Sequence, residues 1–94
     1  TVALTYSQSK AGADEAVAAI ARAGGAAFAL HADLSDARSI PTLFGQLDAE
    51  LSKRKGSNSL DILVNNAGVG LGSLIPLVPM NKLRFVMEVN FFAL

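Results

Sequence analysis

Two neighbouring carboxamides stand where a buried apolar run ends. Asn65 and Asn66 directly follow the branched residues of 62–64, and Ala67 and Gly68 come next. A carboxamide donates and accepts hydrogen bonds without carrying charge, and a glycine can adopt positive φ and let a ligand approach the backbone. This order of residues suits a binding site for a polar ligand, although the same tetrapeptide also serves as a simple turn at the end of a strand.

A third carboxamide, Asn90, follows a segment with helical spacing near the end of the chain. Leu83, Val86 and Met87 mark one apolar face of the predicted helix, and Asn90 continues that face. A side-chain amide that points into an apolar interior needs hydrogen-bond partners. Asn90 is therefore either a satisfied core amide or a functional one.

Strands and helices that alternate along the chain must position these side chains. The residues of 62–64 do not alternate with polar residues, which indicates a strand covered on both faces, as in a parallel sheet between helices. Ligands bind beyond the carboxyl ends of such strands. We predict strands at 1–6, 26–31 and 60–64, and helices at 11–23, from Ser35 or Ser39 to the basic residues at 53–55, and from about Asn81 onward.

The second of these helices has two possible starts. Its apolar stripe runs through Ile40, Leu43, Phe44, Leu47 and Leu51. Ser35 can cap it only if Pro41 is tolerated in a kinked first turn, because an interior proline removes a backbone hydrogen bond. If the helix starts at Ser39, Pro41 falls in the first turn, where proline is accepted.

Composition excludes several classes of protein. The 94 residues carry a formal net charge of zero, 51% of them are hydrophobic, and cysteine is absent. We therefore expect no nucleic-acid partner, no disulfide, no metal site and no membrane association. The first residues lack the pattern of a signal peptide, so a cytoplasmic location is the expectation.

The segment 60–68, Leu-Asp-Ile-Leu-Val-Asn-Asn-Ala-Gly, resembles the fourth-strand motif of the short-chain dehydrogenase/reductase family. The resemblance extends over the whole chain: 2–7 is similar to the second strand of the family, 27–34 to the third strand with its Asp-Leu ending, and 88–90 to the active-site asparagine segment. It implies an α/β fold, a Rossmann-like three-layer α/β/α parallel sheet, of which this chain forms part.

The turn after the first predicted strand bears on the cofactor. An acidic residue at that position binds the ribose 2′-hydroxyl of NAD and repels a 2′-phosphate. Here the turn holds Ser7 and Lys10, and no acid precedes Asp14. The resemblance thus implies that Ser7 contacts the cofactor and that NADP is preferred over NAD, unless these are ordinary turn residues.

The resemblance also assigns roles at the other strand ends. Asp33 and Leu34 match residues that lie against the adenine ring, although Asp33 alone could be a solvated turn residue. Asn66, Ala67 and Gly68 match residues that line the ribose next to the nicotinamide.

Asn90 matches the asparagine of a catalytic tetrad with Ser, Tyr and Lys, in which it holds a water of the proton relay. The implied activity is hydride transfer between NADP and a small carbonyl or alcohol substrate, in an intact protein that forms a homodimer or homotetramer. The family's TGxxxGxG turn and its YxxxK pair have no match in the 94 residues. We therefore expect this chain to be the central part of one NAD(P)-binding domain and to be inactive alone.

Two alternatives compete with this interpretation. One is a nucleotide-binding pseudoenzyme or regulatory module on the same fold. The other is a flavodoxin-like signalling domain with Asp33 as phosphoacceptor, which would need an acidic cluster near the strand ends. The other two predicted strands supply no such cluster.

Overall fold

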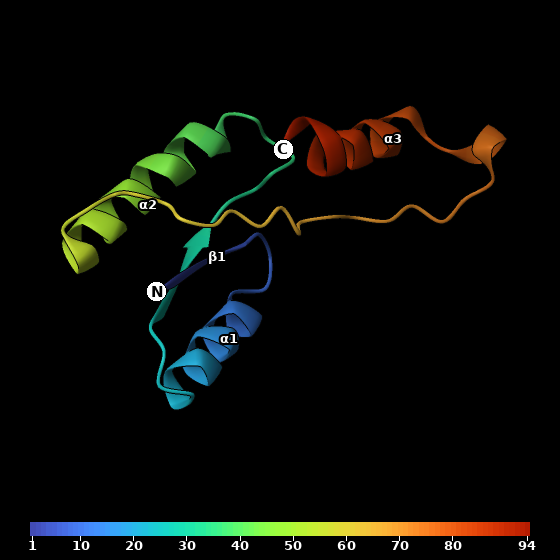
Figure 1. The fold of residues 1–94 in the computed structure, drawn as a ribbon. Helices are drawn as coiled ribbons and strands as arrows, with labels where there is room; N and C mark the ends of the chain where they lie inside the picture. The colour runs from blue at the N-terminus through green and yellow to red at the C-terminus, as the bar shows by residue number, and fades with distance from the viewer.

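A pair of parallel strands with a helix on each face forms the packed part of the chain. The computed structural model describes residues 1–94 apart from the side chain of Ile75. Strands β1 (Val2–Tyr6) and β2 (Ala27–His31) pair in parallel, with their first and last residues opposite one another. Helix α1 (Lys10–Arg22) covers one face and α2 (Ser39–Lys55) the other (Figure 1). This α/β/α layering is the predicted Rossmann-like arrangement in partial form.

Local capping sets the limits of α1. The Ser9 hydroxyl accepts a hydrogen bond from the Gly12 amide at 3.2 Å and so satisfies one of the free amides of the first turn. After Arg22 the chain leaves the helix through Gly24, whose φ of 86° is left-handed. The side chain of Ala13 is buried against the strands, so this small residue lets the helix approach the sheet closely.

The start of α2 decides between the two predicted alternatives. The helix begins at Ser39, so Pro41 lies in its first turn and removes no interior hydrogen bond. The prediction that Ser35 caps this helix is wrong, because the Ser35 hydroxyl donates instead to the Asp33 carboxylate at 2.6 Å. The helix ends at Gly56, which has a φ of 68°.

The third predicted strand is wrong. Residues 60–64 run as an extended segment without strand pairing, and Ile62, Leu63 and Val64 are 78%, 63% and 74% exposed rather than covered on both faces. A strand exists only where a neighbour supplies backbone hydrogen bonds. The hydrogen-bonded sheet of the described residues contains only β1 and β2, so this segment lacks such a neighbour.

The rest of the chain forms an arm that leaves the packed part and returns towards it (Figure 1). It contains a short 3₁₀ turn (Ile75–Leu77), helix α3 (Met80–Met87) and a π-helical turn (Glu88–Phe92) that continues α3. The radius of gyration is 15.7 Å, against about 13 Å for a compact domain of 100 residues. The arm thus makes the molecule elongated.

No helix among the described residues combines the length and hydropathy needed to cross a membrane.

Candidate functional site

An open cleft of about 690 Å³ lies at the carboxyl ends of β1 and β2. Its volume is in the range of about 300–1,000 Å³ that is usual for small-molecule sites. Four parts of the chain line it: residues 5–8 after β1, residues 32–35 after β2, residues 67–70 of the extended segment, and Phe85 and Val89 of the C-terminal helix. Segments far apart in sequence therefore meet where a parallel sheet binds ligands.

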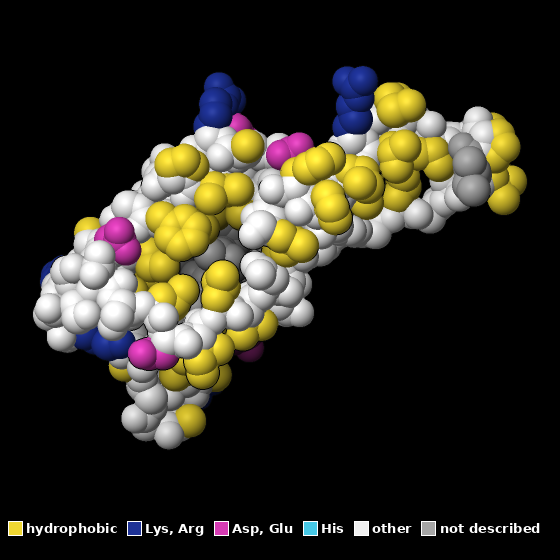
Figure 2. All heavy atoms as spheres, turned by 45° about the horizontal axis from the view of Figure 1, so that its top comes forward, with side chains coloured by type: hydrophobic (Ala, Val, Ile, Leu, Met, Phe, Trp, Pro, Cys, Tyr) yellow, Lys and Arg dark blue, Asp and Glu magenta, His cyan; other side chains and the backbone are white. Residues whose placement is uncertain are grey.

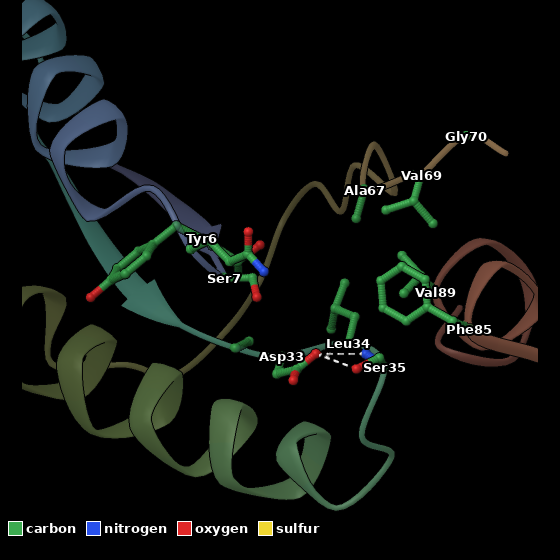
Figure 3. Close-up of a pocket in the computed structure, with 14 residues that line it drawn as sticks. Tyr6, Ser7, Asp33, Leu34, Ser35, Ala67, Val69, Gly70, Phe85 and Val89 are labelled. Carbon is green, nitrogen blue, oxygen red and sulfur yellow. Dashed lines mark hydrogen bonds between the residues drawn. The ribbon is translucent and has the colours of Figure 1, made fainter. Parts of the chain in front are cut away.

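The cleft brings together five of the six residues predicted to bind a cofactor. They are Ser7, Asp33, Leu34, Ala67 and Gly68. Figure 3 shows Ser7 at the end of β1, with Asp33 and Leu34 at the end of β2 facing the same space. Asn66, the sixth, is exposed and lies outside the lining.

Hydrogen bonds fix the carboxylate of Asp33. Its Oδ1 atom accepts from the Ser35 amide at 3.0 Å and from the Ser35 hydroxyl at 2.6 Å, and its backbone carbonyl accepts from the Ser39 hydroxyl at 2.6 Å. These bonds from the Ser35 hydroxyl and amide hold the pKa of the Asp33 carboxyl below its usual value. The side chain is therefore ionised at neutral pH, and the Oδ2 atom is left as an acceptor for a ligand.

The turn after β1 divides its polar side chains between structure and site. Ser9 caps α1, and the Lys10 ammonium donates to the Asp14 carboxylate at 2.7 Å, which raises the pKa of Lys10. Ser7 lines the cleft, and among the described residues no hydrogen bond engages its hydroxyl. Lys10, the cation that the sequence places near the proposed phosphate site, is therefore paired with Asp14, one helical turn away.

Asn90 joins the C-terminal helix to the extended segment. Its Oδ1 atom accepts from the Val69 amide at 2.8 Å, and its Nδ2 atom donates to the Val69 carbonyl at 2.9 Å. The sequence predicted that the Asn90 amide would have hydrogen-bond partners, and it does. The prediction that Asn90 points into an apolar interior is wrong, because Asn90 is exposed. The pair of bonds fixes the backbone directly after Ala67 and Gly68.

Gly68 does not use its conformational freedom in this structure. Among the described glycines only Gly24 and Gly56 have positive φ, so the positive φ that Gly68 could adopt is not found here. A Cβ atom at this position would lie 3.6 Å from Asn90 Oδ1, which is an ordinary contact.

The sequence did not single out the apolar wall of the cleft. Phe85 and Val89 lie one helical turn apart and line the cleft together with Val69. The signal was available in part, because Val89 directly precedes Asn90 and Phe85 lies four residues before Val89. Helical spacing places such residues on one face.

Other chemistry gains no support among the described residues. No group of three or more His, Cys, Asp or Glu side chains is placed to hold a metal ion. His31 packs edge-on against Tyr6 with ring centroids 5.5 Å apart, and the Tyr6 ring points away from the cleft (Figure 3).

Comparison with known proteins gives one family. The sequence profile described as short chain dehydrogenase matches residues 1–94. An uncharacterised oxidoreductase of Methylorubrum extorquens is 39% identical over 89 residues, which are 95% of this chain and 34% of that protein. The chain thus spans about a third of the length of this relative.

Two solved ketoreductase structures share the fold. The promiscuous reductase LugOII, which catalyses keto-reduction at C1 during lugdunomycin biosynthesis, is 41% identical, with a TM-score of 0.92 over 98% of this chain and 38% of that one. The landomycin C-6 ketoreductase LanV, solved with bound NADP and rabelomycin, is 35% identical, with a TM-score of 0.92 over 97% of this chain and 37% of that one.

Proposed function

The chain belongs to the short-chain dehydrogenase/reductase family, and on this premise we propose that residues 1–94 are the central part of the NAD(P)-binding domain of an NADP-dependent oxidoreductase. The substrate is a small carbonyl or alcohol compound. The names of two similar proteins, both ketoreductases, support reduction of a ketone as the direction of the reaction. The intact protein is proposed to act as a homodimer or homotetramer.

The observation that carries the proposal is the cleft at the ends of β1 and β2. It offers a hydroxyl from Ser7, an ionised acceptor from Asp33 and an apolar surface from Leu34. A hydroxyl can donate to a ribose phosphate, an ionised carboxylate can accept from the exocyclic amine of adenine, and an apolar surface can cover the face of the purine. The residues present therefore fit the adenosine part of the cofactor.

The absence of an acid near Ser7 favours NADP. Asp33, the one carboxylate of the cleft lining, lies after β2 rather than β1. A negative side chain beside a 2′-phosphate would repel it, whereas a serine hydroxyl can donate to it. Similar structures with bound NADP support the same preference.

The second end of the cleft is proposed to face the nicotinamide. Ala67 and Gly68 line it, and Asn66 stays in the proposed set through the family resemblance alone. Bound NADPH would supply the hydride for the reduction of a ketone. The contribution of this chain is positional: Asn90 holds the Val69 backbone and thereby the two residues before it.

No proton donor is proposed among these residues. Tyr6 is the only tyrosine, and its ring points away from the cleft (Figure 3). We therefore propose that the 94 residues bind the cofactor without turning over substrate. A nucleotide-binding module without catalysis, the second candidate, shares this cleft and differs only in lacking a donor elsewhere in its polypeptide.

Replacement of Ser7 by Asp tests the cofactor assignment in the polypeptide that carries these residues. The Ser7→Asp variant should bind NADPH about tenfold more weakly, because an added carboxylate repels the 2′-phosphate. Affinity for NADH should not fall. Titration of cofactor fluorescence measures both.

Ser57→Asp is the matched control, because it adds the same charge on a serine outside the cleft lining. Equal NADH and NADPH affinities before and after Ser7→Asp would overturn the NADP assignment. A protein that binds both nucleotides but reduces no ketone would favour the module without catalysis.

A further inference from the structure

Phe85 is a large aromatic side chain that is 47% exposed at the wall of the cleft. It lies on α3, one turn before Val89, and Figure 3 shows the Leu34 side chain pointing towards both. Leu34 adjoins Asp33 in the chain. The apolar wall and the Asp33 carboxylate, whose Oδ2 atom accepts no hydrogen bond among the described residues, line the same cleft.

We propose that Phe85 is a specificity residue for the adenine ring, against which its own ring stacks while Asp33 Oδ2 accepts from the exocyclic amine. This inference rests on the proposed binding of NADP. The chemistry is that of an aromatic platform beside a hydrogen-bond acceptor, which suits a purine that carries an amino group.

A purely structural role for Phe85 fits the contacts less well. Among the exposed large apolar side chains described for residues 57–94, Phe85 is the one that lines the cleft. Phe91 and Phe92, which follow it in the C-terminal helical segment, pack edge-on against each other with centroids 5.4 Å apart and do not line the cleft. Phe85 belongs to no described aromatic pair and is 47% exposed.

The pairing with Leu34 assigns Phe85 to the adenine end in this proposal. Leu34 follows Asp33, and its side chain points towards Phe85 across the cleft; Val69, which follows Gly68, lines the cleft beside Phe85 as well. A stacking ring at Phe85 should therefore affect ligands that contain adenosine. The affinity for ligands that contain only the nicotinamide half should not depend on this ring.

The test uses the polypeptide that carries residues 1–94 and three probes. NADPH contains both halves of the cofactor, 2′,5′-ADP contains only the adenosine half, and reduced nicotinamide mononucleotide contains only the other half. Phe85→Ala should weaken NADPH and 2′,5′-ADP by about tenfold, which is a typical loss for one base stacked on an aromatic ring. Phe85→Trp should restore affinity to within about threefold, because it keeps an aromatic face.

Phe91→Ala is the matched control, because it removes an exposed ring, at 63%, from the same C-terminal helical segment outside the cleft lining. It should leave all three affinities unchanged, measured by calorimetry. If Phe85→Ala unfolds the protein, Phe85→Leu keeps the apolar volume and should still lose the aromatic part of the affinity.

Three results would overturn the inference. If Phe85→Ala binds 2′,5′-ADP with unchanged affinity, the ring does not contact adenine. Where the alanine variant unfolds, the same result for Phe85→Leu leads to the same conclusion. Equal weakening of reduced nicotinamide mononucleotide would show a general collapse of the cleft. If the unaltered protein binds none of the probes, the proposed function fails, and this inference fails with it.

Discussion

The two halves of the chain differ in how they bury their apolar side chains. Residues 1–55 contain four of the five buried apolar residues, namely Ala13, Phe28, Ala32 and Leu51, and the fifth is Val89. Of the fifteen large apolar side chains described as exposed, thirteen belong to residues 57–94. Figure 2 shows hydrophobic side chains gathered along the arm and a further group over the packed part.

The difference follows from the distance in sequence between interacting segments. In the first half a strand, a helix and a second strand that follow one another supply each other's partners. The second half meets the rest chiefly through the cleft and the tie between Asn90 and Val69. Contacts between distant segments are formed late and at a higher entropic cost, so this half depends on partners that its own residues do not supply.

The largest expected effect concerns the polypeptide of residues 1–94 by itself. Ile62, Leu63 and Val64 form an exposed, extended apolar run with unpaired backbone groups, which favours association through strand edges. The polypeptide should associate or unfold in part, and its sedimentation should depend on concentration. Ile62→Lys should reduce this association.

Phe44→Lys is the matched control from the first half, because Phe44 is also exposed, at 46%, but lies on a regular helix. It should leave association unchanged. A concentration-independent monomer mass with one cooperative thermal transition would contradict the prediction.

The next largest expected effect concerns the two hydrogen bonds between Asn90 and Val69, which link the second half to itself and to the cleft. Asn90→Ala removes both hydrogen bonds to Val69 and frees the segment proposed to face the nicotinamide. In the polypeptide that carries these residues we expect kcat to fall about a hundredfold, because a displacement of about 1 Å in a positioning segment can cost that much in rate. The dissociation constant for NADPH should rise less than about threefold, because most binding comes from the adenosine end.

Asn81→Ala serves as its control, because Asn81 lies on the same helix and bonds only to the neighbouring Lys82 amide. It should leave both constants unchanged. A loss in kcat below about threefold for Asn90→Ala would identify a purely structural amide.

The parts of the fold predicted correctly from sequence are those with local causes. The apolar runs of β1 and β2, and the start of α2 at Ser39, which was one of the two starts that the sequence offered, each depend on neighbours within a few residues. The segment 60–64 has the same kind of apolar run as these strands. It still forms no strand, because its pairing depends on residues that composition and spacing do not specify.

The site divides in the same way. Ser7 could be predicted because strand ends mark the ligand-binding edge of a parallel sheet, whereas Asp33 and Leu34 were assigned through the family resemblance. Phe85 could not be predicted, because its side chain reaches the cleft only through the path of the whole arm. The pairing of Asn90 with Val69 spans 21 residues and was equally invisible in local spacing.

The smallest expected effect is a difference between the two halves in how their hydrogen bonds respond to pH. Asp33 is held by Ser35 in the first half, and this lowers the pKa of the carboxyl below its ordinary value of 3.8. A lowered pKa in the folded state stabilises the turn above pH 3.8, and this contribution is lost as the pH falls through the lower value. Asn90 and Val69 form a tie without a titrating group, so protection of the Val69 amide from hydrogen exchange should not change through the titration of Asp33.

Carbon NMR of the side-chain carboxyl should give a midpoint below 3.8 for Asp33, and Ser35→Ala should raise it by removing the hydroxyl bond, the largest cause of the shift. The midpoint should still lie below 3.8, because the backbone amide of residue 35 still donates to the Asp33 carboxylate. Asp36 is the internal control, since its pKa is lowered by Arg38 and should be the same in both proteins. A midpoint of 3.8 or above in the unaltered protein would mean that the bonds to Ser35 do not persist in solution, and the turn of the first half would then be no better ordered than the arm.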